Sequence, residues 1–214
     1  MTAKLPVTYI PGIIPENQQG VFDDLLKDLA WEQRPDAPRM EYWTNSFGRS
    51  YTYGRGKGIR TYESQPSHVL IDVINATVTR AVHRVLGEQF PNLATMEPFE
   101  GCFLNCYKGE RDHLGWHADD DPGINHDHPI AVVTVGAGRM LQIKRQNGLT
   151  GPDDGTDPAQ VHDFFLEPGS LLLMHPGMQS FWYHRIPKVG HKVEPRISLT
   201  YRALLPIVAI PEEA

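Results

Sequence analysis

The sequence predicts an α+β fold: a double-stranded β-helix, or jelly-roll, core buttressed by N-terminal helices. Two observations predict it. Apolar residues recur at helical spacing in two segments before residue 95, and after residue 96 the pattern changes to short strands separated by Gly, Pro, Asn and Asp turns. We expect one domain over residues 1–214, with the helices and a flap at about 39–63 in residues 1–95, and the jelly roll in residues 96–204.

Two amphipathic helices are expected in the N-terminal part. The first covers residues 15–31, after a short strand and turn at 8–15, and is expected to bury Val21, Leu25, Leu26 and Leu29. The second covers residues 67–86, with Gly87 as a C-cap. Its expected apolar stripe consists of Val69, Leu70, Val73, Ile74, Ala81, Val82 and Val85.

Residues 39–63 lack a helical period and are rich in aromatic, glycine and basic residues. We expect two short strands there, near 39–43 and 50–53, in a flap that is too polar to be a core hairpin. The core strands are expected near 103–107, 113–119, 130–135, 139–145, 161–166, 170–174, 180–185 and 196–203. The Gly- and Pro-rich loop 147–160 is expected to be variable or disordered.

Composition narrows the possible partners. The formal net charge of −6 means that any contact with nucleic acid must come from local basic patches. Two are candidates: Arg49, Arg55, Lys57 and Arg60 in the flap, and Arg139, Lys144 and Arg145 further on. No apolar run is long enough to span a bilayer and no secretory signal is seen, so we expect no membrane partner. The two cysteines, Cys102 and Cys106, predict no disulfide framework, hence a cytoplasmic protein, or a nuclear one in a eukaryote.

A metal site is predicted around His117 and Asp119. On a strand, residues two apart point to one face, so an imidazole and a carboxylate can reach one point there. His184 is the best third ligand, and two His with one carboxylate make the facial triad of non-heme iron(II) oxygenases. The alternative pair, His126 and His128, lies in a Gly- and Pro-rich segment that is less rigid.

One face of the last strand carries Arg196, Ser198, Thr200 and Arg202, opposite an apolar face of Ile197, Leu199 and Tyr201. Two guanidinium groups and two hydroxyls on one face suit a cavity that binds a small dicarboxylate, because arginine offers paired donors to a carboxylate. The alternative is an exposed strand with ordinary charges.

Several stretches together carry a family resemblance over residues 38–204. They are Asn105-Cys106-Tyr107, Asp112 to Asp121, Pro129-Ile130-Ala131, Val135-Gly136-Ala137, Gly169 to Met174, Trp182-Tyr183-His184 and Pro195 to Arg202. In order and spacing they resemble the AlkB family of Fe(II)/2-oxoglutarate-dependent dioxygenases, in the branch that repairs alkylated bases in DNA.

The resemblance implies a role for each matching residue. His117, Asp119 and His184 would be the catalytic triad that binds Fe(II), with O2 as co-substrate. The residues implied to hold or line the 2-oxoglutarate pocket are Asn105, Tyr107, Arg196, Ser198, Thr200 and Arg202. The substrate residues would be Arg39, Tyr51, Tyr53 and Asp121, with the flap holding a flipped base.

The function expected from the resemblance is oxidative demethylation of N-alkylated bases, of the 1-methyladenine and 3-methylcytosine type, in DNA. Nucleic acid, most simply methylated DNA, is then the expected partner of a monomeric enzyme. One alternative keeps the chemistry and changes the substrate to RNA, a protein side chain or another modified base. Another alternative is a non-catalytic jelly-roll binding module. A zinc hydrolase is the last, and it would leave the arginine-lined face of the last strand without a function.

Overall fold

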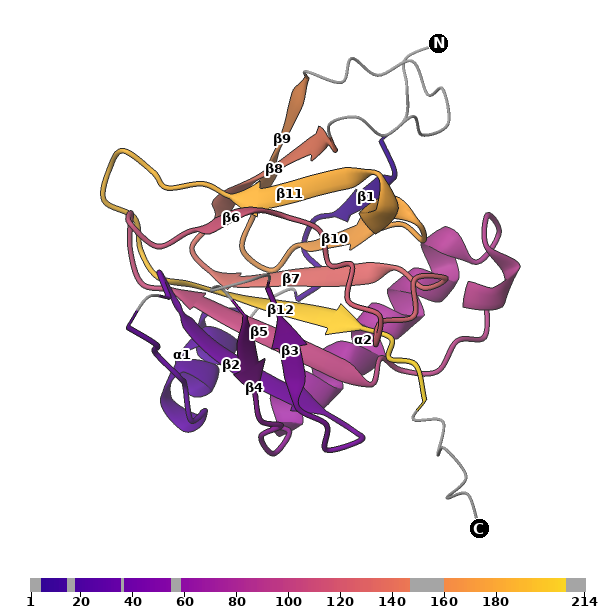
Figure 1. Ribbon diagram of the computed structural model, residues 1–214, viewed down its shortest axis with the longest axis horizontal. Helices are drawn as coiled ribbons and strands as arrows, with labels where there is room; N and C mark the ends of the chain where they lie inside the picture. Colours follow the sequence, from indigo (N-terminus) through magenta and orange to yellow (C-terminus); the bar gives the residue numbers. More distant parts are fainter. Residues whose placement is uncertain (1–4, 15–17, 36, 55–58, 147–159, 207–214) are drawn as a thin grey trace.

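The computed structural model describes the chain except residues 1–4, 15–17, 36, 55–58, 147–159 and 207–214 (Figure 1). A six-stranded sheet has the order β1-β10-β7-β12-β5-β2, a four-stranded sheet the order β6-β11-β8-β9, and β3 and β4 form a separate pair. The strands are β1 (Val7–Ile10), β2 (Met40–Asn45), β3 (Tyr51–Tyr53), β4 (Arg60–Tyr62), β5 (Gly101–Tyr107), β6 (Leu114–His117), β7 (Ile130–Gly136), β8 (Arg139–Arg145), β9 (Val161–Leu166), β10 (Leu171–Met174), β11 (Trp182–Ile186) and β12 (Arg196–Arg202).

All strand pairings are antiparallel, and the two larger sheets are consistent with the predicted jelly roll. The last strand, β12, lies between β5 and β7 in the middle of the six-stranded sheet and is buried on both faces. Its residues alternate as predicted: Ile197, Leu199 and Tyr201 join the core on one side, while Arg196 and Arg202 face a cavity on the other. This period of two places the polar site and the apolar core on opposite faces of the same strand.

The helices are α1 (Gln18–Asp28) and α2 (Val69–Leu86), and α2 runs behind the six-stranded sheet (Figure 1). Side chains of both helices belong to one cluster of buried residues with strand residues of β5, β7 and β12. The side chain of His68 caps α2 by accepting a hydrogen bond from the backbone N–H of Leu70. Gly87 is the C-cap, as predicted.

The predicted apolar stripes of both helices are partly wrong. Leu26, Val69, Val73 and Val85 are exposed, whereas Phe22, Ile71 and Val78 are buried. Apolar residues occur around much of each helix, so their spacing admits more than one stripe. The position of the sheet decides which stripe becomes the interface, and the sequence pattern does not contain that position.

The flap prediction is also corrected. β2 is the edge strand of the six-stranded sheet, paired with β5 and buried at four of its six residues, so it is not part of a surface flap. The flap consists of β3 and β4 alone. Tyr42 of β2 packs in the cluster that contains the helices, and Trp43 packs in the cluster that contains the flap tyrosines. Both faces of β2 are therefore covered by other parts of the protein. The polar residue Glu41 is buried within β2, which the local sequence pattern does not indicate.

The second basic patch does not exist as a surface feature. Arg139 and Arg145 are buried, and Arg139 donates hydrogen bonds to the carbonyl oxygens of Gly109, Asp112 and Pro187. In the first predicted basic patch, which lies in the flap, Arg55 and Lys57 are outside the described residues. The loop predicted to be variable, 147–160, is also outside them except for residue 160.

Both cysteines are free and buried, as small hydrophobic residues would be. Within the described ranges, no helix is both long and apolar enough to cross a membrane.

Candidate active site

Three potential metal ligands converge between the two sheets. His117 ends β6 and His184 lies in β11, where the antiparallel register sets them opposite each other with ring centroids 4.1 Å apart. The candidate ligand atoms of His117, Asp119 and His184 all lie within 4.8 Å of one another. Among the described residues, this is the one group of His, Cys, Asp and Glu side chains with such spacing.

His117 and Asp119 come together in a different way from the expected placement on one face of a single strand. β6 ends at His117, so Asp119 lies in the irregular segment that follows and not on the same strand face. Its backbone N–H donates a 2.9 Å hydrogen bond to the Oε1 atom of Gln179, a buried residue just before β11. This hydrogen bond links Asp119 to the segment that precedes β11, the strand that carries His184.

The protonation states of the three side chains suit a cation. The Nδ1 atom of His117 lies 2.9 Å from the carbonyl oxygen of Gly115, an acceptor that fixes the proton on Nδ1 and leaves Nε2 with a lone pair. Burial lowers the pKa of His117, and burial together with His117 lowers that of His184 to about 3, so both imidazoles are neutral at pH 7. Burial alone would raise the pKa of Asp119, but the charge and the hydrogen bonds of the Arg202 guanidinium outweigh that effect and keep the carboxylate ionised.

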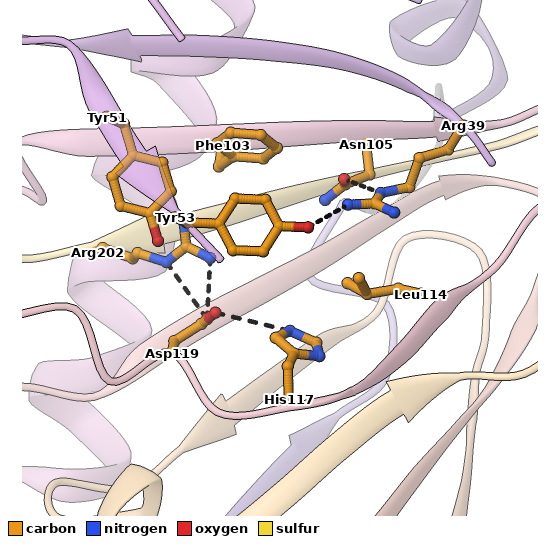
Figure 2. A pocket seen from close by; sticks show the side chains of 9 residues that line it. All are labelled: Arg39, Tyr51, Tyr53, Phe103, Asn105, Leu114, His117, Asp119 and Arg202. Carbon is orange, nitrogen blue, oxygen red and sulfur yellow. Dashed lines mark hydrogen bonds and ion pairs between the residues drawn. The ribbon is translucent and has the colours of Figure 1, made fainter. Parts of the chain in front are cut away.

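Arg202 clamps the carboxylate of Asp119. Its Nη2 and Nε atoms lie 2.9 and 3.3 Å from Oδ2, and both residues are buried (Figure 2). The pair leaves the other oxygen, Oδ1, facing His117 at 3.7 Å from Nε2. Arg202 thus holds the candidate metal ligand directly, a role that the sequence did not predict. Its buried Nη1 atom has no hydrogen-bond partner among the described residues.

The triad and Arg196, a second buried arginine, line one cavity between the two larger sheets, called the inner cavity below. The Nη2 atom of Arg196 donates a 2.9 Å hydrogen bond to Oγ1 of Thr134, while Nε and Nη1 have no partner in the part of the chain that the structure describes. The side chain is fully buried, and burial lowers its pKa to about 10. Because a buried cation without a counter-charge is costly, this arrangement fits an anionic ligand whose carboxylate meets Arg196.

The other predicted cofactor residues line that inner cavity. Register sets Tyr107 of β5 opposite Arg196 of β12, and Asn105 opposite Ser198. The guanidinium of Arg196 lies 5.4 Å from the Tyr107 ring centroid. The cavity is lined by Asn105, Tyr107, Ser198 and Thr200 together with the triad and both arginines, so one small dicarboxylate beside a divalent metal ion fits its donor set.

The chamber in Figure 2 is lined by side chains of the flap and of the site, and it shares Asn105, His117 and Asp119 with the inner cavity. A neighbouring open cleft of about 480 Å³ shares His117 with the chamber, and its volume is within the roughly 300–1,000 Å³ typical of small-molecule sites. Tyr51 and Tyr53 line both spaces.

Three of the four predicted substrate residues line the open cleft: Tyr51, Tyr53 and Asp121. The two tyrosine rings are nearly parallel, at 9° and 6.2 Å between centroids. Tyr51 is buried and packs on Trp43, so part of its surface is already used by the protein. One oxygen of Asp121 accepts a hydrogen bond from the backbone N–H of Gly123 at 2.7 Å.

Arg39, the fourth, lines the chamber but is turned toward other protein groups. It is buried, donates a 2.6 Å hydrogen bond to Oδ1 of Asn105, and lies 2.6 Å from the carboxylate of Glu41. The roles of Glu41 and Gln179 were not predicted, because neither residue belongs to a recognised motif.

His126, one of the two alternative metal ligands, forms a hydrogen bond through Nε2 with the carbonyl oxygen of Asp121.

Comparison with known proteins agrees with this geometry. A similar curated protein is bovine "Alpha-ketoglutarate-dependent dioxygenase alkB homolog 3", which is 30% identical over 94% of this chain; the human protein of that name is 28% identical over the same share. An Arabidopsis thaliana "DNA oxidative demethylase ALKBH2" is 28% identical over 92% of this chain. The chain spans 66% of the length of each of these relatives.

A solved structure of OsALKBH1 shares the fold, with a TM-score of 0.64, 15% identity, and coverage of 94% of this chain and 97% of that one. The model of the 2OG-Fe(II) oxygenase superfamily matches residues 6–202, a span that contains the triad and both buried arginines. The chain therefore belongs to the 2OG-Fe(II) oxygenase superfamily.

Proposed function

We propose that this protein is an Fe(II)- and 2-oxoglutarate-dependent dioxygenase that demethylates N-alkylated bases, of the 1-methyladenine and 3-methylcytosine type, in nucleic acid and first of all in DNA. The observation that carries the chemistry is the adjacency, in one buried cavity, of a His-Asp-His triad and an arginine with unpaired donors. The name of the Arabidopsis relative, "DNA oxidative demethylase ALKBH2", supports the choice of substrate.

In this proposal His117, Asp119 and His184 hold Fe(II), and Arg202 holds Asp119 in its binding orientation. Arg196 binds the distal carboxylate of 2-oxoglutarate, with Ser198 and Thr200 beside it. When bound, Fe(II) and 2-oxoglutarate supply the oxidising power that places one oxygen atom of O2 on a substrate C–H bond, with succinate and carbon dioxide as co-products. An N-methyl group hydroxylated in this way leaves as formaldehyde and restores the base.

The chain's own residues then act by positioning. The base would enter the open cleft, where Tyr53 offers an aromatic face and Asp121 a carboxylate for an exocyclic amino group. Stacking of a base on an aromatic ring is worth roughly 1–3 kcal/mol. His117 lines all three spaces, so a methyl group presented from the cleft would be directed toward the metal site.

We also infer that residues 1–214 form a single dioxygenase domain in which α1 and α2 support the sheet that carries both buried arginines. The shared cluster of buried residues from the helices and from β5, β7 and β12 supports this role. A zinc hydrolase is disfavoured, because it would leave the buried Arg196 without a counter-charge.

The test is a turnover assay with the Fe(II)-loaded full chain, 2-oxoglutarate and O2. Oligonucleotides carrying 1-methyladenine or 3-methylcytosine, single- and double-stranded, in DNA and RNA, are the substrates, and unmethylated strands are the control. We expect formaldehyde and succinate in equal amounts with a methylated DNA strand. Binding of 2-oxoglutarate without formaldehyde from any strand would contradict the demethylase assignment, and would favour a different substrate or a non-catalytic binding module.

A further inference from the structure

A buried ion pair lies between the flap and the main sheet. Arg39 directly precedes β2 and Glu41 lies within it, two residues further on. The Nη2 atom of Arg39 is 2.6 Å from Oε1 of Glu41, and the two side chains are 3% and 0% exposed. A pair so shielded from water interacts strongly, and removing one partner leaves an uncompensated buried charge.

Each member of this pair holds one tyrosine of the flap. The hydroxyl of Tyr53, in β3, accepts a hydrogen bond from Nη2 of Arg39 at 3.2 Å (Figure 2). The hydroxyl of Tyr62, in β4, donates a hydrogen bond to Oε2 of Glu41. Since β3 and β4 pair only with each other among the described strands, these two phenols anchor both strands of the flap to one ion pair.

The same guanidinium also reaches the inner cavity. The Nε atom of Arg39 donates a 2.6 Å hydrogen bond to Oδ1 of Asn105, which lines both the inner cavity and the chamber (Figure 2). With its oxygen occupied in this way, the Asn105 amide has its NH2 group left as the donor for a ligand. One planar group therefore bonds at the same time to a cofactor-pocket residue, to the flap and to Glu41.

We propose that Glu41 is a positioning residue that, through Arg39 and Tyr62, orders the flap and couples it to the cofactor pocket. It touches neither the triad nor the inner cavity, so its effect is indirect. The coupling rests on the proposed function: occupancy of the pocket at Asn105 fixes Arg39, and a fixed Arg39 holds Tyr53 where the base stacks. By linkage, nucleic acid must then strengthen 2-oxoglutarate binding by the same factor.

The test uses two variants of the full chain. Glu41→Gln keeps the shape and removes the charge, and Tyr62→Phe removes only the hydroxyl that links Glu41 to β4. The matched control is Glu63→Gln, the same chemical change at an exposed position next to β4. Circular dichroism first establishes folding; should Glu41→Gln fail to fold, Tyr62→Phe carries both measurements.

The first measurement is amide hydrogen exchange of β3 and β4 in the protein without metal or ligands. We expect exchange about tenfold faster or more in both variants, with β7 and β12 unchanged and Glu63→Gln like the wild type. Wild-type exchange rates in the flap of both variants would overturn the positioning role. This result does not depend on any activity.

The second measurement is the dissociation constant of a 3-methylcytosine oligonucleotide with and without 2-oxoglutarate, with Mn(II) bound in place of iron and O2 excluded. We expect 2-oxoglutarate to tighten binding by about fivefold or more in the wild type, and not in the variants. A wild-type ratio of one, or a ratio retained in both variants, would overturn the coupling. A wild type that binds no methylated strand would refute the proposed function, while the exchange measurement still decides whether Glu41 orders the flap.

Discussion

Replacing Arg196 by methionine should make the ligand-free protein more stable while it removes 2-oxoglutarate binding. Arg196 is fully buried, and its hydrogen bond to Thr134 leaves Nε and Nη1 without partners among the described residues. A buried cation in this condition lowers stability until an anion binds. Methionine fills a similar space without charge, so the substitution removes the desolvation cost.

The magnitude follows from the pKa. Burial lowers the pKa of Arg196 to about 10. Because one pKa unit corresponds to about 1.4 kcal/mol, the charged form is destabilised in the folded protein by roughly 3 kcal/mol. The sign is fixed: a folded-state pKa below the unfolded one disfavours the protonated arginine on folding, and this cost is fully present at pH 7. We expect Arg196→Met to raise the free energy of unfolding by up to about 3 kcal/mol, or the Tm by about 6–12 °C.

The ligand effect has the opposite sign. Two hydrogen bonds from a guanidinium to a carboxylate are worth about 1.5–3 kcal/mol each, so the variant should bind 2-oxoglutarate at least about 100-fold more weakly. Urea unfolding gives the stability, and the rise of Tm with 2-oxoglutarate in the Mn(II)-loaded protein gives the affinity.

Arg139→Met is the matched control. Arg139 is equally buried, but it donates to the carbonyl oxygens of Gly109, Asp112 and Pro187. Its loss removes the donor of three part-buried carbonyl oxygens and should destabilise the protein by about 3 kcal/mol. If Arg196→Met destabilises the ligand-free protein as Arg139→Met does, or still gains stability from 2-oxoglutarate, the reasoning on Arg196 is refuted.

Three further predictions test the rest of the site. His117→Ala or Asp119→Ala should abolish succinate formation and reduce bound Fe(II), measured by metal analysis; full turnover in the presence of an iron chelator would exclude the triad. Arg202→Gln should weaken metal binding about 10- to 100-fold by freeing the Asp119 carboxylate, as followed by metal titration, and unchanged affinity would show that the clamp is dispensable. Tyr53→Ala should raise the KM for a methylated oligonucleotide by about tenfold with a smaller change in the KM for 2-oxoglutarate, and equal changes in both would argue against base stacking.

The core strands and the polar face of β12 were predictable from local pattern, whereas β4 of the flap was not predicted. A period of two along residues 196–202 already separates Arg196 and Arg202 from Ile197 and Leu199, whatever the strand packs against. The helix stripes and the flap were predicted less well. Leu26 and Val73 are as apolar as the residues buried in their place, and β2 joins the edge of the sheet by pairing with β5, which is distant in the sequence.

The sequence alone predicted which side chains would form the site, and for His117, His184, Arg196 and Arg202 it also predicted that they lie on strands. The charges and contacts of these residues depend on the three-dimensional packing. The clamp of Arg202 on Asp119, the unpaired donors of Arg196 and the use of Arg39 by Glu41, Tyr53 and Asn105 all join segments far apart in the chain. Burial and charge pairing depend on neighbours in space, whereas periodicity reports only neighbours along the chain.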